Sequence, residues 1–537
     1  MAPQTFDFIV VGSGSGGGAV AGRLSENGKY TVLCLEAGDK DQRYIWSRPP
    51  AGTVFLVDNP KVNWRYQSEP NETTGGRPIY VPRGKMLGGS SSINGTIYNR
   101  GQAIDYDTWA QMGNRGWSYS DILPFLKKIE TTDVGSDEYR GRSGPIRVTE
   151  AAKISPFYDM YIAAANAAGI PSNPDYSGAS QEGVAMAQQT VYKGERQSTA
   201  TQYLAPARKR ANVTIISGAE AESLILEGKR CVGVRYRRNG QLEESRAGRE
   251  VVVSCGAANT PKLLELSGIG NPDILSKHGI PCAHELRGVG ENLRDHFAAV
   301  MKWRFNREGI SIANRGQGLG LAKEVMNYLL FRKGFISQGI GTMRVFARSR
   351  QDLENPDIMM VVAPYIIELR EGRGRRMSPV HGFFCYSHVQ RTESTGTMHI
   401  RSANPADPPR INFRFLDTVN DRLTSIATVR KAREIVAQSP IVEAIAEELT
   451  PGPNVQTDDE ILDFLRREGQ ITHHMVGTCR MGQDPMAVVD DRLRVRGIQG
   501  LRLADASVMP TIPSGNTNIP CIMVGEKCAA MVLEDAA

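Results

Sequence analysis

FIVVGSGSGGG, residues 8–18, is the stretch that decides the fold of this chain. An apolar run breaks there into glycines spaced as G-x-G-x-x-G, and the helix-like segment AVAGRL, residues 19–24, follows. A second apolar run, YTVLCL, residues 30–35, ends at Glu36. Strand, glycine turn, helix, strand and terminal acid in this order are typical of a dinucleotide-binding βαβ unit.

Each glycine of this motif has its own role. Gly12 allows the tight turn, Gly14 lets the backbone approach a pyrophosphate, and Gly17 lets the helix pack on the strand. The N-terminus of the helix offers free N–H groups and positive potential to phosphates, and Glu36 would accept hydrogen bonds from a ribose diol. A glycine-rich surface loop is the alternative interpretation, but it does not explain the two flanking apolar runs. The sequence therefore predicts a dinucleotide site.

Composition excludes several other classes of function. The 537 residues exceed a typical domain of ~150 residues and favour two or more lobes. The net charge of +6 is small and spread along the chain, so we expect no nucleic-acid partner. No apolar run approaches the ~20 residues of a membrane span. The histidines form no cluster with metal-ligand spacing, so we expect no metal site.

The chain shows no secretory signal before its first apolar run, and its eight cysteines contain no C-x-x-C pair. Both features favour a cytoplasmic protein with reduced thiols. An export signal that was removed before residue 1 stays open as an alternative.

Residues 297–465 differ from the first part in their pattern of predicted secondary structure, which indicates a second lobe. They combine alternating strand patterns, long polar loops and helical segments near 418–437 and 457–467. The tail returns to a strand-like segment at 501–505 and a helix over 518–533, so the first lobe is discontinuous. We predict an α/β fold: a Rossmann-like nucleotide-binding lobe and an α+β substrate lobe built on an antiparallel sheet. The first lobe comprises residues 1–150, 190–296 and 466–537, and the second comprises 151–189 and 297–465.

Apolar periodicity predicts further elements of the two lobes. Ile122, Phe125, Leu126 and Ile129 recur at i, i+3, i+4 and i+7, which is typical of one face of a helix over 119–131. Other expected elements are a helix at 155–168, strands at 213–216 and 250–256, and a hairpin at 223–238.

Four further segments carry distinctive motifs: GKMLGGSSSIN (84–94), GAANTPKLLELSGIG (256–270), HMVGTCRMG (474–482) and PSGNTNIP (513–520). Together with the glycine turn, and in this order, they resemble the signatures of the glucose–methanol–choline (GMC) flavin oxidoreductases over essentially the full length of the chain. The resemblance implies FAD rather than NAD in the nucleotide site.

The resemblance also implies which residues contact FAD. Some family members carry a histidine in the second glycine loop that is covalently bonded to the flavin. Ile93 stands there in this chain, so we expect non-covalent FAD. Residues 256–270 are either a packing turn or a second contact. The expected contacts are Gly12, Gly14, Ser15, Gly17, Glu36, Ala37, Gly88, Gly89, Ser92, Asn94, Gly95, Ala221, Asp505, Ala506, Asn516 and Thr517.

His474 is the predicted catalytic base, because it matches the family's catalytic histidine and an imidazole can take the hydroxyl proton of an alcohol. Its predicted partner is Asn516, with Asn518 as the alternative, and a neutral amide there would position the substrate oxygen. We expect His473 to face elsewhere. Asp295 and His296 also match a family pattern, as residues that are structural or near the flavin.

These features predict an FAD-dependent alcohol oxidoreductase that oxidises a primary alcohol, with aromatic and furanic alcohols among the candidates, to the aldehyde. His474 acts as base, hydride goes to flavin N5, and electrons pass to O2 or another acceptor. A hydroxynitrile lyase of the same fold and a flavin-binding protein without catalysis are the alternatives.

The substrate itself is left open by the sequence. A carboxylate and an aromatic cage, which choline would need, cannot be assigned. Residues 370–376 are strongly basic and favour either a solvated loop or the recruitment of an anionic substrate. Met359, Met360 and Phe346 could line a substrate pocket or fill the core.

Overall fold

The N-terminal apolar runs lie at the centre of a seven-stranded sheet in the computed structural model, which describes residues 4–41, 43–370 and 374–537. The strand order is β12 (Val213–Ser217), β2 (Val32–Glu36), β1 (Gln4–Val11), β15 (Gln241–Val253), β14 (Arg230–Arg238) and β13 (Ala219–Glu227), and β28 (Leu501–Leu503) pairs with β15. The core strands are parallel, whereas β13, β14 and β15 form an antiparallel meander. This mixed sheet confirms the predicted Rossmann-like lobe.

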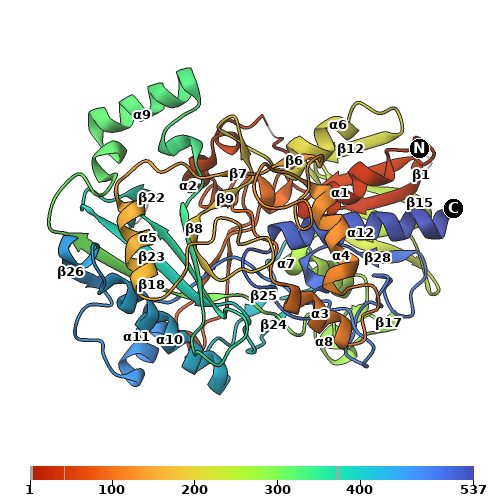
Figure 1. Ribbon diagram of the computed structural model, residues 1–537. Coiled ribbons are helices and arrows are strands. Elements are labelled where there is room, and N and C mark those ends of the chain that lie inside the picture. Colours follow the sequence, from red (N-terminus) through yellow and green to blue (C-terminus); the bar gives the residue numbers. More distant parts are fainter. Residues whose placement is uncertain (1–3, 42, 371–373) are drawn as a thin grey trace.

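Helix α1 (Ser15–Leu24) follows the glycine turn and packs on α12 (Asn518–Ala536), so the two ends of the chain meet (Figure 1). The contact is close because both helices carry glycine: a Cβ on Gly525 would lie 2.4 Å from the backbone oxygen of Gly16. The terminal helix begins at the predicted residue and extends three residues further than predicted.

Further helices cover the first lobe. α4 (Tyr119–Ile129) buries Ile122, Leu126 and Ile129 as its periodicity predicts, and a capping box of Ser118 and Asp121 fixes its start. This lobe also contains α2 (Thr53–Leu56), α3 (Ala103–Gln111), α6 (Ala205–Ala207), α7 (Gly256–Leu266) and α8 (Pro272–Lys277), and α9 (Gly318–Phe331) belongs to the second lobe.

The second sheet is antiparallel and also has seven strands within the described residues. Its order is β26 (Ile445–Thr450), β18 (Phe297–Phe305), β23 (Gly382–Val389), β20 (Ile358–Ala363), β19 (Met343–Ala347) and β8 (Gly183–Met186), and β27 (Gln470–Ile471) pairs with β18. Helices α5 (Phe157–Ala167), α10 (Val419–Val436) and α11 (Asp458–Glu468) lie together beside this sheet (Figure 1). The antiparallel sheet with helices confirms the predicted α+β character of this part.

Short strand pairs connect the larger elements. They are β3 (Tyr66–Gln67) with β4 (Tyr80–Val81), β5 (Glu130–Thr131) with β6 (Ile146–Arg147), β7 (Thr149–Glu150) with β9 (Gln188–Gln189), β10 (Val191–Tyr192) with β11 (Glu195–Arg196), β16 (Ile269–Gly270) with β17 (His284–Glu285), β21 (Ile367–Arg370) with β22 (Gly374–Met377), and β24 (Thr397–His399) with β25 (Arg410–Asn412). Among the described residues, no helix has both the length and the apolar character needed to cross a bilayer.

The pairing of β27 bears on the lobe boundaries. We propose that the two sheets mark the two lobes, with β8 of the segment 151–189 joining the second sheet. On this proposal β27, which pairs with β18, belongs to the second lobe, and the boundary lies after Ile471 instead of at the predicted residue 466.

Candidate active site

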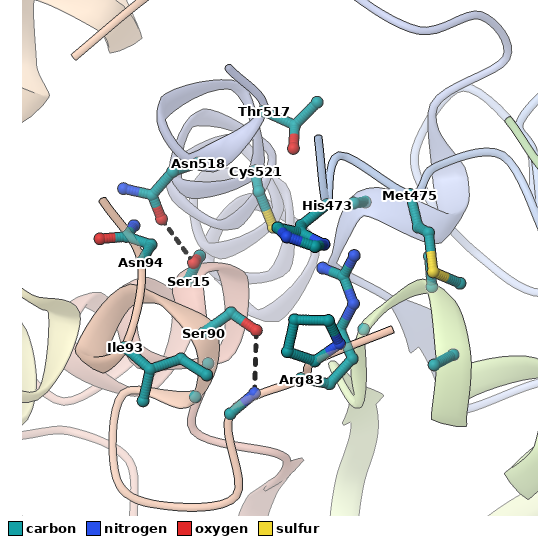
Figure 2. Close-up of a pocket in the computed structure, with 18 of the residues that line it drawn as sticks. Ser15, Arg83, Ser90, Ile93, Asn94, His473, Met475, Thr517, Asn518 and Cys521 are labelled. Atoms are coloured by element: carbon teal, nitrogen blue, oxygen red, sulfur yellow. Dashed lines mark hydrogen bonds between the residues drawn. The ribbon is translucent and has the colours of Figure 1, made fainter. Parts of the chain in front are cut away.

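A cavity of about 410 Å³ lies where the two sheets meet, and its walls come from both. One half is formed by the glycine turn after β1, the end of β2 and the loop 84–95. The other half is formed by side chains of β19, β20 and β23. Figure 2 shows the loop bearing Ser90, Ile93 and Asn94 opposite the start of α12, where Thr517 and Asn518 lie.

The two glycine loops touch in the first half of the cavity. Gly12 has a left-handed φ of 95°, and a Cβ there would lie 2.3 Å from the carbonyl oxygen of Ser254. A Cβ on Gly89 would lie 2.8 Å from the Cα of Gly14. A Cβ on Gly14 itself would meet no atom within 4 Å, so this glycine faces open cavity.

Glu36 anchors the glycine turn from the end of β2. One carboxylate oxygen accepts hydrogen bonds from the backbone N–H of Ser13 at 3.2 Å and from its hydroxyl at 2.6 Å, and the other accepts from the N–H of Gly38 at 2.9 Å. Burial raises the pKa of Glu36 above its usual value. The acid predicted to receive a ribose therefore also shapes the loop that would receive the phosphates.

Most predicted cofactor contacts line the cavity, and three do not. A Cβ on Gly17 would lie 2.0 Å from the carbonyl oxygen of Gly12, so Gly17 serves helix packing. Gly88 adopts a left-handed turn, and the hydroxyl of Ser92 donates to the carbonyl of Leu87 at 2.7 Å, which turns it away. The predicted contacts on the wall are Gly12, Gly14, Ser15, Glu36, Ala37, Gly89, Asn94, Gly95, Ala221, Asp505, Ala506, Asn516 and Thr517.

Asp505 ties the segment 256–270 to this half of the cavity. Its Oδ2 accepts hydrogen bonds from the N–H of Gly256 at 2.9 Å and from the hydroxyl of Thr260 at 2.6 Å, and its Oδ1 accepts from the N–H of Ser507 at 2.8 Å. Residues 256–259 line the cavity. The segment is therefore both a packing turn and part of the wall.

His474 lies at the junction of the two halves and is held on both ring nitrogens. Its Nε2 accepts a hydrogen bond from the amide Nδ2 of Asn516 at 2.9 Å. Its Nδ1 lies 2.9 Å from Nδ1 of His296 and 2.7 Å from the hydroxyl oxygen of Thr472. Asn518, the alternative partner, instead accepts a hydrogen bond from the hydroxyl of Ser15 at 2.7 Å (Figure 2).

The neighbours of His474 fix where its proton sits. Nε2 of His296 lies 2.7 Å from the carbonyl oxygen of Gln390, so it carries the proton and leaves a lone pair on Nδ1. That lone pair accepts from Nδ1 of His474, whose Nε2 is then unprotonated. Burial lowers the pKa of both histidines well below the usual value. His474 is thus a neutral base with its lone pair toward Asn516.

Of the residues beside His474, His473 departs from the sequence-based expectation, whereas Asp295 and His296 contact His474 from the side. His473 lines the cavity, with a left-handed φ of 67° and no hydrogen-bond partner for its Nδ1 among the described residues. Asp295 accepts from the N–H of His474 at 2.8 Å, and burial raises its pKa to about 7. His296 and His388, whose rings stack at 4.6 Å, complete the surroundings. His388 gave no local sequence signal, because only the register of β23 brings it here.

Of the other residues predicted as candidates for the substrate pocket, some line the cavity and others are buried in the core. Met359 lines the cavity, whereas Met360 and Phe346 are buried in the core. In the basic run, Arg375 lines the cavity, and residues 371–373 lie outside the described residues.

Comparison with known proteins shows the family to which the chain belongs. The family described as GMC oxidoreductase matches residues 6–298 with its N-terminal part and 392–525 with its C-terminal part. The chain belongs to the GMC oxidoreductases. It is 40% identical to an oxygen-dependent choline dehydrogenase of Brucella suis biovar 1, over 98% of this chain and 95% of that one. A choline dehydrogenase of Vibrio vulnificus is 39% identical, over 99% and 94%.

Solved structures agree over the full length. Pyridoxine 4-oxidase from Mesorbium loti superimposes with a TM-score of 0.87 at 27% identity, covering 98% of both chains. A formate oxidase superimposes with a TM-score of 0.92 at 27% identity, covering 100% of this chain and 99% of the other. This GMC oxidoreductase is therefore a flavoprotein with FAD as its cofactor, bound non-covalently as is typical of the family.

The residues of the cavity fit FAD. The open space over Gly14 leaves room for a pyrophosphate beside the start of α1. Two buried nitrogens of Arg83, Nε and Nη2, have no hydrogen-bond partner among the described residues, and neither does Oδ1 of Asn516. All three belong to cavity-lining residues and suit the polar edge of a flavin. Ile93, also on the wall, offers no nucleophilic atom for a covalent link.

Substitutions of Gly14 and Gly17 should have different effects, the first on FAD binding and the second on folding stability. Gly14→Ala adds a methyl group to open cavity, so we expect a folded protein whose Kd for FAD rises about tenfold or more. Gly17→Ala places the methyl group against the backbone of Gly12, so the fold itself should lose ~1–3 kcal/mol. FAD titration of each variant and thermal unfolding distinguish the two effects. Equal FAD affinity in Gly14→Ala and wild type would contradict this placement of the pyrophosphate.

Proposed function

We propose that this GMC oxidoreductase oxidises a primary alcohol to an aldehyde, with His474 as the base and Asn516 as the positioning amide. The observation that carries the proposal is the contact of 2.9 Å between Nε2 of His474 and Nδ2 of Asn516. Both residues line the cavity between the glycine loops, which form its nucleotide half, and the strands β19, β20 and β23. Bound FAD supplies the hydride acceptor at N5. Binding of FAD requires neither side chain, which favours a catalytic role for the pair.

The two residues divide the chemistry between them. The alcohol replaces the contact between His474 and Asn516, so that its hydroxyl donates to Nε2 and its oxygen accepts from the amide. His474 then takes the hydroxyl proton, and the amide stabilises the developing negative charge on oxygen. The hydrogen bond from Nδ1 to His296 keeps the ring in the orientation that this transfer requires. Residues of both sheets line the cavity around these groups.

The alcohol class and the electron acceptor complete the proposal. Apolar wall residues such as Met359, Val361 and Phe384 favour an alcohol with an apolar body, aromatic and furanic alcohols included. Electrons then pass to O2 or another acceptor. Admission of air after anaerobic reduction distinguishes an oxidase from a dehydrogenase.

Loss of the base should slow the first half-reaction. His474→Ala should lower the rate constant for anaerobic reduction of bound FAD by an alcohol ~100-fold or more, because general-base catalysis is removed. Stopped-flow absorbance of the flavin bands measures it, and the FAD content of the variant is the control for folding. Reduction at a near-normal rate would refute the assignment. Flavin bands that stay oxidised with every alcohol would favour the lyase.

The pH dependence should reflect the buried state of His474. Burial, with His296 and His388 nearby, lowers its pKa, so the neutral base persists as the pH falls below the usual value of about 6.5. The rate constant for flavin reduction should therefore stay constant through pH 6.5 and decline only at clearly lower pH. A pH series in the stopped-flow instrument measures this profile. A decline centred at or above 6.5 would show a base of ordinary pKa.

The two asparagines should have separable effects. Asn516→Ala should slow flavin reduction ~100-fold while FAD occupancy is retained, because it removes the amide beside Nε2 of His474. Asn518→Ala removes a hydrogen bond to Ser15 at the start of α1, so it should weaken FAD binding by about tenfold and leave reduction of bound FAD nearly unchanged. Reduction kinetics and FAD titration on both variants give the comparison. The opposite pattern would assign the catalytic amide to Asn518.

A further inference from the structure

The second sheet presents a cation to the cavity. Register aligns Arg344 of β19 with Val361 of β20, and Val361 with Tyr386 of β23. The next row on the same face aligns Met359 with His388. All five residues line the cavity. Arg344 is therefore part of the wall that faces the substrate.

Arg344 is buried in the cavity wall without a carboxylate partner. Of the other buried arginines, Arg100 and Arg140 pair with Glu130, and Arg502 pairs with Glu250. Arg196 also lacks a carboxylate, but it donates to neutral oxygen atoms and does not line the cavity. Arg344 is 1% exposed, lines the cavity and forms no ion pair within the described part of the chain. A buried cation without a counter-charge is costly, so its position in a cavity wall favours an anion from outside the chain.

The hydrogen bonds of Arg344 leave one edge of its guanidinium free. Nη1 donates to the carbonyl oxygens of Gly341 and Met343, each at 2.8 Å. Nε is buried without a partner, and none of the described residues accepts a hydrogen bond from Nη2. Nε and Nη2 form the edge that binds a carboxylate through two parallel hydrogen bonds. The guanidinium is thus held by the backbone, with this edge unused.

The charges around Arg344 favour an anion as well. Burial lowers its pKa only to about 10, so it is charged at neutral pH. The carboxylates that line the cavity are Glu36, Glu220 and Asp505 among the described residues, and all three belong to the nucleotide half. Arg375, whose Nε lies 3.6 Å from Asp58, adds a second cation on the substrate side.

The guanidinium of Arg344 lies close enough to His388, a neighbour of His474, to affect its pKa. The charge of Arg344 contributes to lowering the pKa of His388, after the larger effect of burial. The ring of His388 in turn lies 6.5 Å from that of His474. Arg344 and His474 thus line the same cavity, with His388 near both.

We propose that Arg344 determines substrate specificity, and that the substrate is an alcohol that carries a carboxylate. The carboxylate pairs with the free Nε–Nη2 edge of Arg344, and the hydroxyl reaches His474 and Asn516. The inference rests on the proposed alcohol oxidation. It also implies that the quaternary ammonium of choline, the substrate in the names of the relatives, is repelled from this cavity.

Matched alcohols test the charge preference of the wild-type holoenzyme. The probes are ω-hydroxy carboxylates of increasing chain length, para-(hydroxymethyl)benzoate, the methyl ester of each, and choline. We expect carboxylates to reduce bound FAD with a KM at least about tenfold below that of their esters, and choline to give no reduction. Preference for choline or for the esters would overturn the inference and leave alcohol oxidation standing. Absence of reduction by every alcohol would instead refute the proposed function.

Variants assign the preference to Arg344. Arg344→Met should raise the KM for the preferred carboxylate about 10- to 100-fold, a much larger effect than on the KM for its ester, and Arg344→Lys should have an intermediate effect. Arg304→Met is the matched control, because Arg304 lies in the same sheet, pairs with Glu447 at the surface and carries the same charge. Equal losses for carboxylate and ester, or an equal effect of Arg304→Met, would overturn the assignment.

Binding without turnover gives a second readout. para-Toluate, which lacks the hydroxyl group, should perturb the visible spectrum of bound FAD in wild type with a Kd about 10- to 100-fold lower than in Arg344→Met. If Arg344→Met does not fold, the comparison uses Arg344→Lys, in which charge is kept and the fork is lost. A Kd that is the same in wild type and variant would show that the carboxylate binds elsewhere.

Discussion

A chain of hydrogen bonds from the carbonyl of Gln390 through His296 to His474 is the interaction on which the candidate active site depends. It begins at the end of a strand in the second sheet and reaches the C-terminal part of the first lobe through Asn516. Each link decides the protonation of the next ring, because an imidazole nitrogen is either donor or acceptor. The relative position of the lobes therefore sets the chemical state of the base.

Burial keeps the rings of this chain neutral. Around His474 the other rings are also imidazoles, and burial lowers the pKa of His388 to about 4 and that of His473 to about 3. Neutral rings around His474 leave its Nε2 able to accept a proton from a substrate. In the same low-polarity surroundings, the unpaired charge of Arg344 interacts strongly with any counter-charge, because the local dielectric constant is low.

The sequence predicts those features whose signals are local. The glycine turn, the acid at the end of β2 and the amphipathic pattern of α4 each lie within one short window, and the structure confirms these elements. His474 could be found because its motif is continuous in the chain. His296 also lies in a continuous motif, but its contact with His474 could not be predicted. His388 and Arg344 could not be assigned in this way, since strand pairing between distant segments brings them to the cavity. His473 was expected to face elsewhere because neighbours in regular structure diverge, but its left-handed backbone turns it to the cavity.

The packing of α12 against α1 has a consequence for biosynthesis. The wall of the cofactor cavity combines Gly12 and Gly14 with Asp505 and Asn516, which lie far apart in the sequence and leave the ribosome at different times. At ~5–20 residues per second, about half a minute to two minutes separate the two events. During this interval the nascent nucleotide lobe lacks one strand of its sheet and its terminal helix. An FAD site that uses all four residues is therefore complete only after residue 516 has been translated.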